Sequence, residues 1–137
     1  MASHHKNGAI RMTDHNVELA YRNLLEVFGE RDPRKRAQAI SEIYAEDVTF
    51  ADPDEVVVGW TELGAKAQGL LDGAPGFVFT PVGDVRVIQN LAMLSWHFGP
   101  EGAPPVVGGT DICIIENGLI THLYTALDPM PTTGPEA

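Results

Sequence analysis

Cysteine is nearly absent from this chain of 137 residues, since Cys113 is the only one. A single cysteine cannot form an internal disulfide, and its place in the apolar run 112–115 predicts a buried, unreactive thiol. Long apolar runs are also absent. No stretch approaches the roughly 18 residues that cross a bilayer, and the N-terminus lacks the apolar core of a signal peptide. We therefore expect a cytoplasmic protein with no membrane partner.

Basic residues are scarce. Nine Lys and Arg stand against nineteen Asp and Glu, which gives a formal net charge of −10. Such a charge repels the phosphates of nucleic acids and favours solubility. We therefore expect no nucleic-acid partner.

Several chemical signatures are missing. There is no glycine-rich phosphate loop after a strand, no Cys or His cluster at metal-ligand spacing and no nucleophilic serine in an elbow. The pair His4-His5 is too short a cluster for a metal site. We therefore expect no metal and no cofactor, and we expect neither phosphoryl transfer nor zinc chemistry.

The length fits a single domain. Residues 1–13 are polar and aperiodic and are predicted to form a flexible leader, and residues 129–137, with three prolines, are predicted to form a loose tail. The domain is then expected over residues 14–128.

Three helices are predicted in the first half of the chain. Apolar residues recur at three and four from Val17 to Phe28, and Gly29 fits the end of that helix. Asp32-Pro33 is typical of an N-cap followed by proline at the first helical position, and this second helix runs to Tyr44. Thr61 is predicted to cap a third helix that ends at 73–76.

The remaining segments predict strands, at 48–51, 56–58, 77–80, 82–88, 91–98, 106–116 and 119–127. Asn117-Gly118 is the strongest hairpin signal. Three helices followed by an antiparallel meander predict an α+β fold, with the helices on one face of a curved, mostly antiparallel sheet. The later strands are apolar on both faces, since Ile112 and Ile114 alternate with Cys113 and Ile115. We therefore expect a homodimer through the outer face of the sheet.

Two acids next to apolar strands are the candidate catalytic residues. Asp52 follows strand 48–51 and precedes Pro53, so it either anchors a turn by accepting backbone N–H bonds or serves as a catalyst. Asp111 interrupts an apolar strand, and burial without a cationic partner should raise its pKa. Its structural alternative is a sealed position, hydrogen-bonded to His97, Tyr44 or Trp96.

Five further residues are candidates for binding a substrate: Tyr44, Trp60, Met93, Trp96 and His97. Alternation places Trp96 and His97 on opposite faces, so only one can line the pocket. If Met93, Ser95 and His97 share the face of Asp111, Trp96 belongs to the outer interface; a bulge reverses this. Tyr44 either points its hydroxyl into the cavity or packs in the core, and Trp60 either covers the cavity or begins the third helix.

The order of these elements, with Tyr-Ala-Glu-Asp-Val-Thr-Phe-Ala-Asp-Pro at 44–53, Thr110-Asp111 and Asn117-Gly118-Leu119-Ile120, resembles the nuclear transport factor 2-like superfamily, and its SnoaL-like branch in particular. The resemblance covers nearly the whole chain after residue 14. It implies a conical, barrel-like fold whose cavity serves isomerases, polyketide cyclases, dehydratases, epoxide hydrolases and proteins without catalysis, so the fold alone does not give the function.

Ketosteroid isomerase is the nearest positional match. In that enzyme an aspartate before a proline is the general base and a strand aspartate serves the oxyanion, and Asp52 and Asp111 match those positions. The isomerase also carries a tyrosine on its first helix, whereas here the matching region 23–27 has none, with Leu24 and Leu25 expected inward.

Two other branches of the superfamily give further comparisons. The acid that epoxide hydrolases need on the last strand is replaced by Leu123, Thr125 and Leu127 at the matching positions. A SnoaL-type cyclase needs one aspartate base, which either Asp52 or Asp111 can supply.

The resulting hypothesis is a cavity that binds a small hydrophobic, carbonyl-bearing or polycyclic molecule. In an isomerase-, cyclase- or dehydratase-like reaction without cofactor, Asp52 takes a proton and Asp111 stabilises the enolate. One alternative is a non-catalytic ligand-binding or dimerisation module of the same fold. Another is a protein-interaction role through the outer sheet face.

Overall fold

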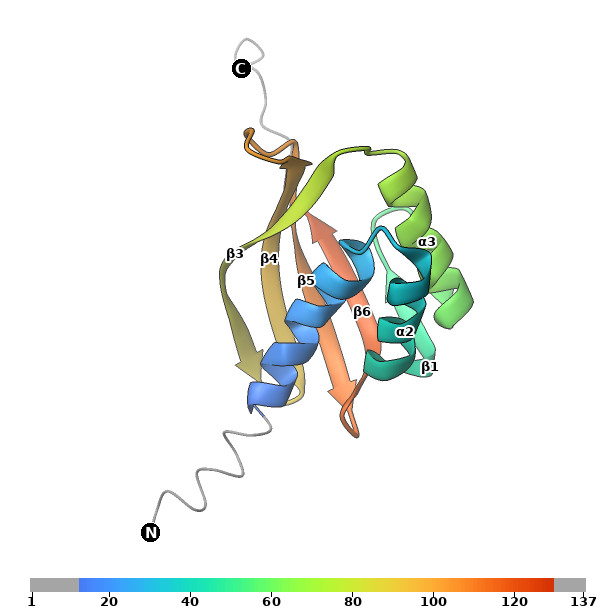
Figure 1. Ribbon diagram of the computed structural model, residues 1–137. Coiled ribbons are helices and arrows are strands. Elements are labelled where there is room, and N and C mark those ends of the chain that lie inside the picture. The colour runs from blue at the N-terminus through green and yellow to red at the C-terminus, as the bar shows by residue number, and fades with distance from the viewer. Residues whose placement is uncertain (1–12, 130–137) are drawn as a thin grey trace.

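The computed structural model describes residues 13–129. The predicted leader and tail lie outside this range, except that residue 13 is already helical and Pro129 follows the last strand. Three helical segments pack on one face of a six-stranded sheet, as Figure 1 shows. The predicted α+β architecture of three helices on a curved, mostly antiparallel sheet is confirmed.

The first helix differs from its prediction in one turn. Residues 13–22 are α-helical, but the next six form the π-helical segment η1 (Asn23–Phe28), which ends at Gly29. A π-turn holds more residues per turn than an α-turn and shifts which side chains face inward. Asn23 is fully buried and Leu24 is 1% exposed, whereas Leu25, expected inward, is 43% exposed.

Helix α2 (Pro33–Ile43) begins as predicted, because the Asp32 side chain accepts a hydrogen bond from the backbone N–H of Arg34. It ends one residue early, since Tyr44 already belongs to strand β1 (Tyr44–Ala51). Helix α3 (Trp60–Asp72) is not capped by Thr61. Its N-cap is Gly59, whose φ of 95° suits glycine, and no side chain caps the helix.

The sheet has the order β2-β1-β6-β5-β4-β3. Besides β1, its strands are β2 (Val56–Val58), β3 (Phe77–Ile88), β4 (Leu91–Pro100), β5 (Val107–Glu116) and β6 (Leu119–Leu127). Only the β1–β6 pairing is parallel. The predicted break at Pro81 does not occur, because the place of β3 at the sheet edge tolerates a proline. The pairing of β3 with β4 is instead irregular between Val82 and Arg86.

The turn between β5 and β6 is the predicted hairpin. Asn117 and Gly118 have φ values of 53° and 79°, the left-handed conformation that a type I′ turn requires at both central positions. The turn sets the pairing of Glu116 with Leu119 and of Ile115 with Ile120, and the register then shifts between Ile115 and Ile114.

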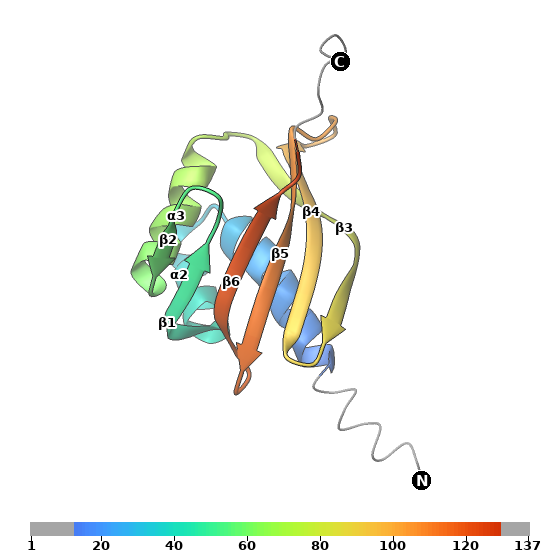
Figure 2. The ribbon, with the colours of Figure 1, turned by 180° about the vertical axis from the view of Figure 1, so that it is seen from behind.

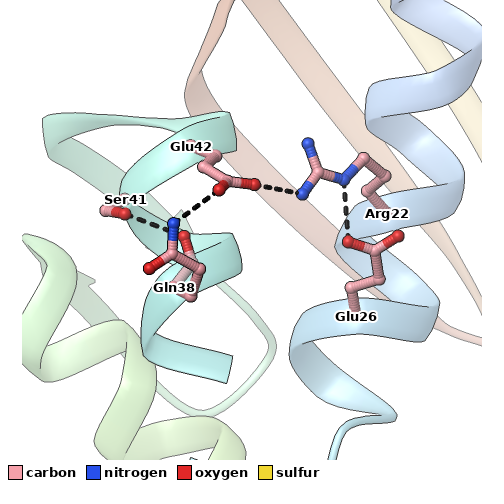
Figure 3. A network of polar contacts seen from close by, with 5 residues as sticks. All are labelled: Arg22, Glu26, Gln38, Ser41 and Glu42. Atoms are coloured by element: carbon pink, nitrogen blue, oxygen red, sulfur yellow. Dashed lines mark hydrogen bonds and ion pairs between the residues drawn. The ribbon is translucent and has the colours of Figure 1, made fainter. Parts of the chain in front are cut away.

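The helices are held together on their outer side by polar contacts that Figure 3 shows. Arg22 donates to Glu26, one turn further along its own helix, at 2.8 Å, and to Glu42 of α2 at 2.5 Å. Glu42 in turn accepts a hydrogen bond from Gln38. The apolar core lies beneath, between these helices and the sheet.

The outer face of the sheet is not covered by any helix of the described chain, as Figure 2 shows from behind. Several apolar side chains are exposed there or at its edges: Val56, Val58, Val78, Val82, Ile88 and Tyr124. The expected second apolar face is therefore present.

Candidate functional site

A pocket of about 550 Å³ opens between the inner face of the sheet, η1 and α3. Its walls are mostly apolar and include four aromatic rings, from Phe28, Phe50, Phe79 and Trp96. Both acids singled out in the sequence, Asp52 and Asp111, line it, so the fold brings them to one cavity. A cavity of this size and lining suits a small, largely apolar molecule.

Asp111 is the buried acid of the pocket, with 4% of its surface exposed. It lies in the middle of β5, opposite Leu94 of β4 and Thr125 of β6. Three side chains donate to its carboxylate. Trp96 Nε1 and Thr125 Oγ1 lie 3.1 and 2.8 Å from Oδ1, and Asn23 Nδ2 lies 2.9 Å from Oδ2.

Burial raises the pKa of Asp111 to about 6, while the hydrogen bonds from Thr125, Trp96 and Asn23 act in the opposite direction. At pH 7 the ionised carboxylate is therefore the predominant form. All three partners are donors, which also suits the ionised form. A carboxylate of this kind accepts protons more readily near neutral pH than an exposed one does.

Asn23 was not singled out by the sequence. Its amide reaches Asp111 from η1, and its Oδ1 accepts a hydrogen bond from the hydroxyl of Tyr44 in β1. The available signal was its spacing: Asn23 follows Ala20 by three residues and precedes Val27 by four, which places a polar side chain on the apolar face of the helix.

Tyr44 is fully buried beneath this contact and does not line the pocket. Of the two positions expected for it, the core position is the observed one. The ring belongs to the apolar core, and the hydroxyl reaches Asn23 instead of the cavity.

The β4–β5 register places Trp96, and not His97, on the face of Asp111. Of the two arrangements that the sequence left open, the one in which Met93, Ser95 and His97 share that face is therefore excluded. No bulge interrupts the pairing from Leu91 to Phe98, so strict alternation puts Trp96 inward and His97 outward. His97 is exposed, and Met93 lines a separate hollow on the outer face.

Trp60 does not cover the pocket. It is the first residue of α3, and its Nε1 donates to the backbone carbonyl of Tyr44 at 3.1 Å. This hydrogen bond links the start of α3 to the start of β1. Of the two positions expected for Trp60, the one at the beginning of the third helix is therefore the observed one.

Asp52 lines the pocket where it borders the exposed residues Asp54 and Glu55, which form its rim. Its Oδ1 accepts the backbone N–H groups of Asp54 and Glu55, and its Oδ2 is 2.9 Å from Lys66 Nζ of α3. Partial burial by itself raises the pKa of Asp52, but Lys66 and the two N–H donors outweigh it and lower the pKa. Asp52 therefore combines the expected turn anchor with an ion pair that the sequence did not predict.

Three exposed acids give the rim of the pocket a negative charge. Asp54, Glu55 and Glu62 line it beside Asp52, and Lys66 is the only cationic residue among the described lining residues. Lys66 also pairs with Glu55 at 2.8 Å, so both of its ion-pair partners are carboxylates of the pocket rim.

The described residues contain no group of three or more His, Cys, Asp or Glu side chains arranged to hold a metal ion. In residues 13–129, no helix is long and apolar enough to cross a membrane.

Comparison with known proteins identifies the fold. The model of the SnoaL-like domain family matches residues 21–123, about three quarters of the chain. No curated protein matches the chain in sequence.

Solved structures agree with this match. A structure from Agrobacterium tumefaciens, named as a "putative isomerase of the SnoaL-like family", has a TM-score of 0.78 and 23% identity, over 85% of this chain and 99% of that one. A "putative SnoaL-like polyketide cyclase" from Jannaschia sp. CCS1 has a TM-score of 0.69 and 16% identity, over 84% and 86%. A "putative ketosteroid isomerase" from Kribbella flavida has a TM-score of 0.66 and 18% identity, over 90% and 86%. At these identities the likeness shows the fold.

Proposed function

This chain belongs to the SnoaL-like domain family, and on that premise we propose that its pocket binds a small, apolar, carbonyl-bearing molecule on which Asp111 acts as a general base. The observation that carries the proposal is the buried carboxylate of Asp111, which lines an aromatic pocket, accepts three hydrogen bonds and has a pKa of about 6. The names of two relatives, an isomerase and a polyketide cyclase, fit proton abstraction next to a carbonyl.

The chemical step is a proton transfer. A C–H bond next to the carbonyl breaks, its proton goes to a carboxylate oxygen of Asp111, and its electron pair enters the carbonyl system as an enolate. Return of the proton to a different carbon completes an isomerisation. Attack of the enolate carbon on a second carbonyl of the same molecule completes a ring closure, and Asp111 then gives its proton to the new alkoxide.

The roles of the two acids differ from those that the sequence suggested. Asp111 has a raised pKa and accepts hydrogen bonds, which favours a base over a donor to an oxyanion. Asp52 has a lowered pKa and is held by Lys66, which makes it a weak base. We therefore assign proton abstraction to Asp111, and we assign Asp52 to shaping the pocket rim.

The lining also restricts the substrate. Among the described lining residues, the one cation is paired with Asp52 and Glu55, so it is not free to neutralise an enolate oxygen. The substrate must then delocalise the charge itself, as a 1,3-dicarbonyl compound or a conjugated ketone does. The acidic rim disfavours an anionic ligand.

A non-catalytic ligand-binding module is the second candidate. One observation favours it: none of the described buried side-chain polar atoms lacks a hydrogen-bond partner, so Asp111 is satisfied without a ligand. The two candidates differ in whether a bound ketone exchanges its α-protons.

The uncovered outer sheet face supports a further part of the proposal, a homodimer formed through that face. We also propose a cytoplasmic location, which the single cysteine, unable to form an internal disulfide, supports. Apolar side chains such as Tyr124 and Ile88 are exposed there, 44% and 64%. A second copy of the chain would remove them from water.

The test is proton exchange into deuterated water. A panel of neutral conjugated ketones and aryl ketones is incubated with the protein, and loss of the α-proton signal is followed by NMR. The proposal expects exchange well above the buffer rate, a decrease of at least 100-fold in Asp111→Asn and a small change in Asp52→Asn. Binding of the panel with exchange equal in wild type and Asp111→Asn would leave the binding module as the function.

A further inference from the structure

We propose that Tyr44, acting through Asn23, is a positioning residue that holds Asp111 as a hydrogen-bond acceptor and so keeps it available as a base. The inference rests on the proposed function, since it concerns the same carboxylate. It assigns to Tyr44 a role other than the substrate contact expected from the sequence.

The contact chain has a fixed direction. The Tyr44 hydroxyl donates to Asn23 Oδ1, and Asn23 Nδ2 donates to Asp111 Oδ2 at 2.9 Å. An amide group has an acceptor end and a donor end, so the end that faces Tyr44 decides which end faces Asp111. With Tyr44 as donor, the NH₂ group of Asn23 is the end that reaches the carboxylate.

The opposite amide orientation would have a different effect on the acid. If Asn23 turned its Oδ1 toward Asp111, the two oxygens would repel each other unless the carboxyl carried a proton to donate. The turned amide thus favours the neutral acid, which cannot accept a substrate proton. The Tyr44 hydroxyl opposes this turn, because its proton would then lose the only acceptor that the described residues give it.

The fold alone does not require a hydroxyl at the buried position of Tyr44. Tyr44 and Asn23 are both fully buried, and a phenylalanine would fill the same core position without a polar group to satisfy. Desolvation, together with the nearby Cys113 and Asp111, raises the pKa of Tyr44 well above its ordinary value, so the hydroxyl remains a donor at every working pH.

The π-helical turn in the first helix is independent evidence for a special role of Asn23. The π-helical segment begins at Asn23, the residue whose amide reaches Asp111. A π-turn costs hydrogen-bond geometry, and such turns often occur where a helix directs a functional side chain. Here the irregular turn starts where an amide has to reach across to β5.

The groups that face Asp111 come from four strands and the helix. Asn23, Trp96 and Thr125 contact it directly from η1, β4 and β6. Tyr44 on β1 and Cys113 on β5 are the titratable groups coupled to it, and both stay protonated near neutral pH because burial raises their pKa values. A titration near pH 6 at this site therefore reports on Asp111.

The test measures the pKa of Asp111 by NMR of its carboxyl carbon in the protein without ligand, so it needs no substrate. Tyr44→Phe keeps the ring and removes the hydroxyl, and the pKa is expected to rise from about 6 to roughly 7. Asn23→Leu removes the amide donor and is expected to raise the pKa at least as much. Tyr124→Phe, the same change on the exposed outer face, is the matched control and should leave the pKa unchanged.

The double variant makes the test specific. If Tyr44 acts through Asn23, then Tyr44→Phe has no further effect on the pKa when Asn23→Leu is already present. A lower melting temperature with an unchanged pKa in Tyr44→Phe would show a purely structural tyrosine and overturn the inference. A pKa increase by the same amount in both backgrounds would also overturn it, because the hydroxyl would then act directly.

The pKa result is separate from the proposed catalysis. A raised pKa in Tyr44→Phe, with no proton exchange by the wild-type protein, would support the positioning role and reject the base. If proton exchange depends on Asp111 but the pKa of Asp111 is unchanged in Tyr44→Phe, the positioning role of Tyr44 is rejected and Asp111 remains the base.

Discussion

Gly109 of β5 lies directly opposite Trp96 of β4, and the space where its side chain would be is occupied by the indole ring. A Cβ on Gly109 would lie 2.6 Å from Trp96 Cζ2 and 2.7 Å from the carbonyl oxygen of Ala126. The missing side chain thus lets the indole lie flat enough against the sheet for its Nε1 to reach Asp111, at 3.1 Å.

We therefore expect Gly109→Ala to destabilise the protein by about 1–3 kcal/mol, because both the ring and the backbone must shift. Displacement of the ring should also weaken the hydrogen bond to Asp111 and raise its pKa. Urea unfolding and carboxyl NMR measure the two effects. Gly69→Ala is the control. A Cβ there meets nothing within 4 Å, and alanine is more favourable than glycine in a helix, so this change should not destabilise the protein. Equal stability of Gly109→Ala and wild type would contradict the packing argument.

Asp111 should give this protein an unusual pH dependence. Its pKa in the folded state, about 6, lies above its ordinary value of 3.8. A raised pKa contributes stability that is complete below pH 3.8 and is lost as the pH rises through 6. The loss is roughly 3 kcal/mol for a difference of about two pKa units. The stability of wild type relative to Asp111→Asn should fall by this order between pH 4 and pH 7, as followed by chemical unfolding. A constant difference would show that the folded protein does not raise this pKa.

Asp52 should behave with the opposite sign. Partial burial opposes its ionisation, but Lys66 and two backbone N–H groups lower its pKa, so its stabilising contribution is present above pH 3.8 and lost as the pH falls through the lowered value. Lys66→Met should raise the pKa of Asp52 and cost about 0.5–1 kcal/mol at pH 7. NMR titration and urea unfolding test this, with the exposed Lys35→Met as control. An unchanged Asp52 pKa in Lys66→Met would contradict it.

The charge of the pocket rim should select between ligands. We expect an aromatic ketone to bind at least tenfold more tightly than the carboxylate of the same ring system, because Asp54, Glu55 and Glu62 line this rim. Calorimetry at low and high salt measures the difference, which should shrink at high salt. Glu62→Gln should reduce the discrimination, whereas Asp84→Asn, which does not line this pocket, should not. Equal affinity for both ligands would show that the rim does not select by charge.

The outer sheet face should control the oligomeric state. Ile112 and Tyr124 lie opposite each other on that face, and lysine at both positions should weaken the proposed dimer at least tenfold. Sedimentation equilibrium measures the dissociation constant. Leu25→Lys, on the exposed side of η1, is the control and should leave it unchanged. A wild-type protein that remains monomeric at about 100 μM would rule out this dimer.

Much of the architecture was determined by the sequence itself. Local patterns were enough to predict the start of α2 at Asp32-Pro33 and the hairpin turn at Asn117-Gly118. Helix capping and turn conformation depend on a few adjacent residues. The sequence also pointed to Asp111 as a buried acid, since a carboxylate in an apolar strand must find partners.

The tertiary structure decided what those partners are. Asn23, Trp96 and Thr125 come from three elements that are far apart in the sequence, and only the strand register and the π-helical turn bring them to one carboxylate. The sequence could not choose between Trp96 and His97, because alternation separates two neighbours without saying which of them faces inward. The pairing of β4 with β5 makes that choice: it sets Trp96 opposite Gly109, where an indole ring has room, and leaves His97 in solvent.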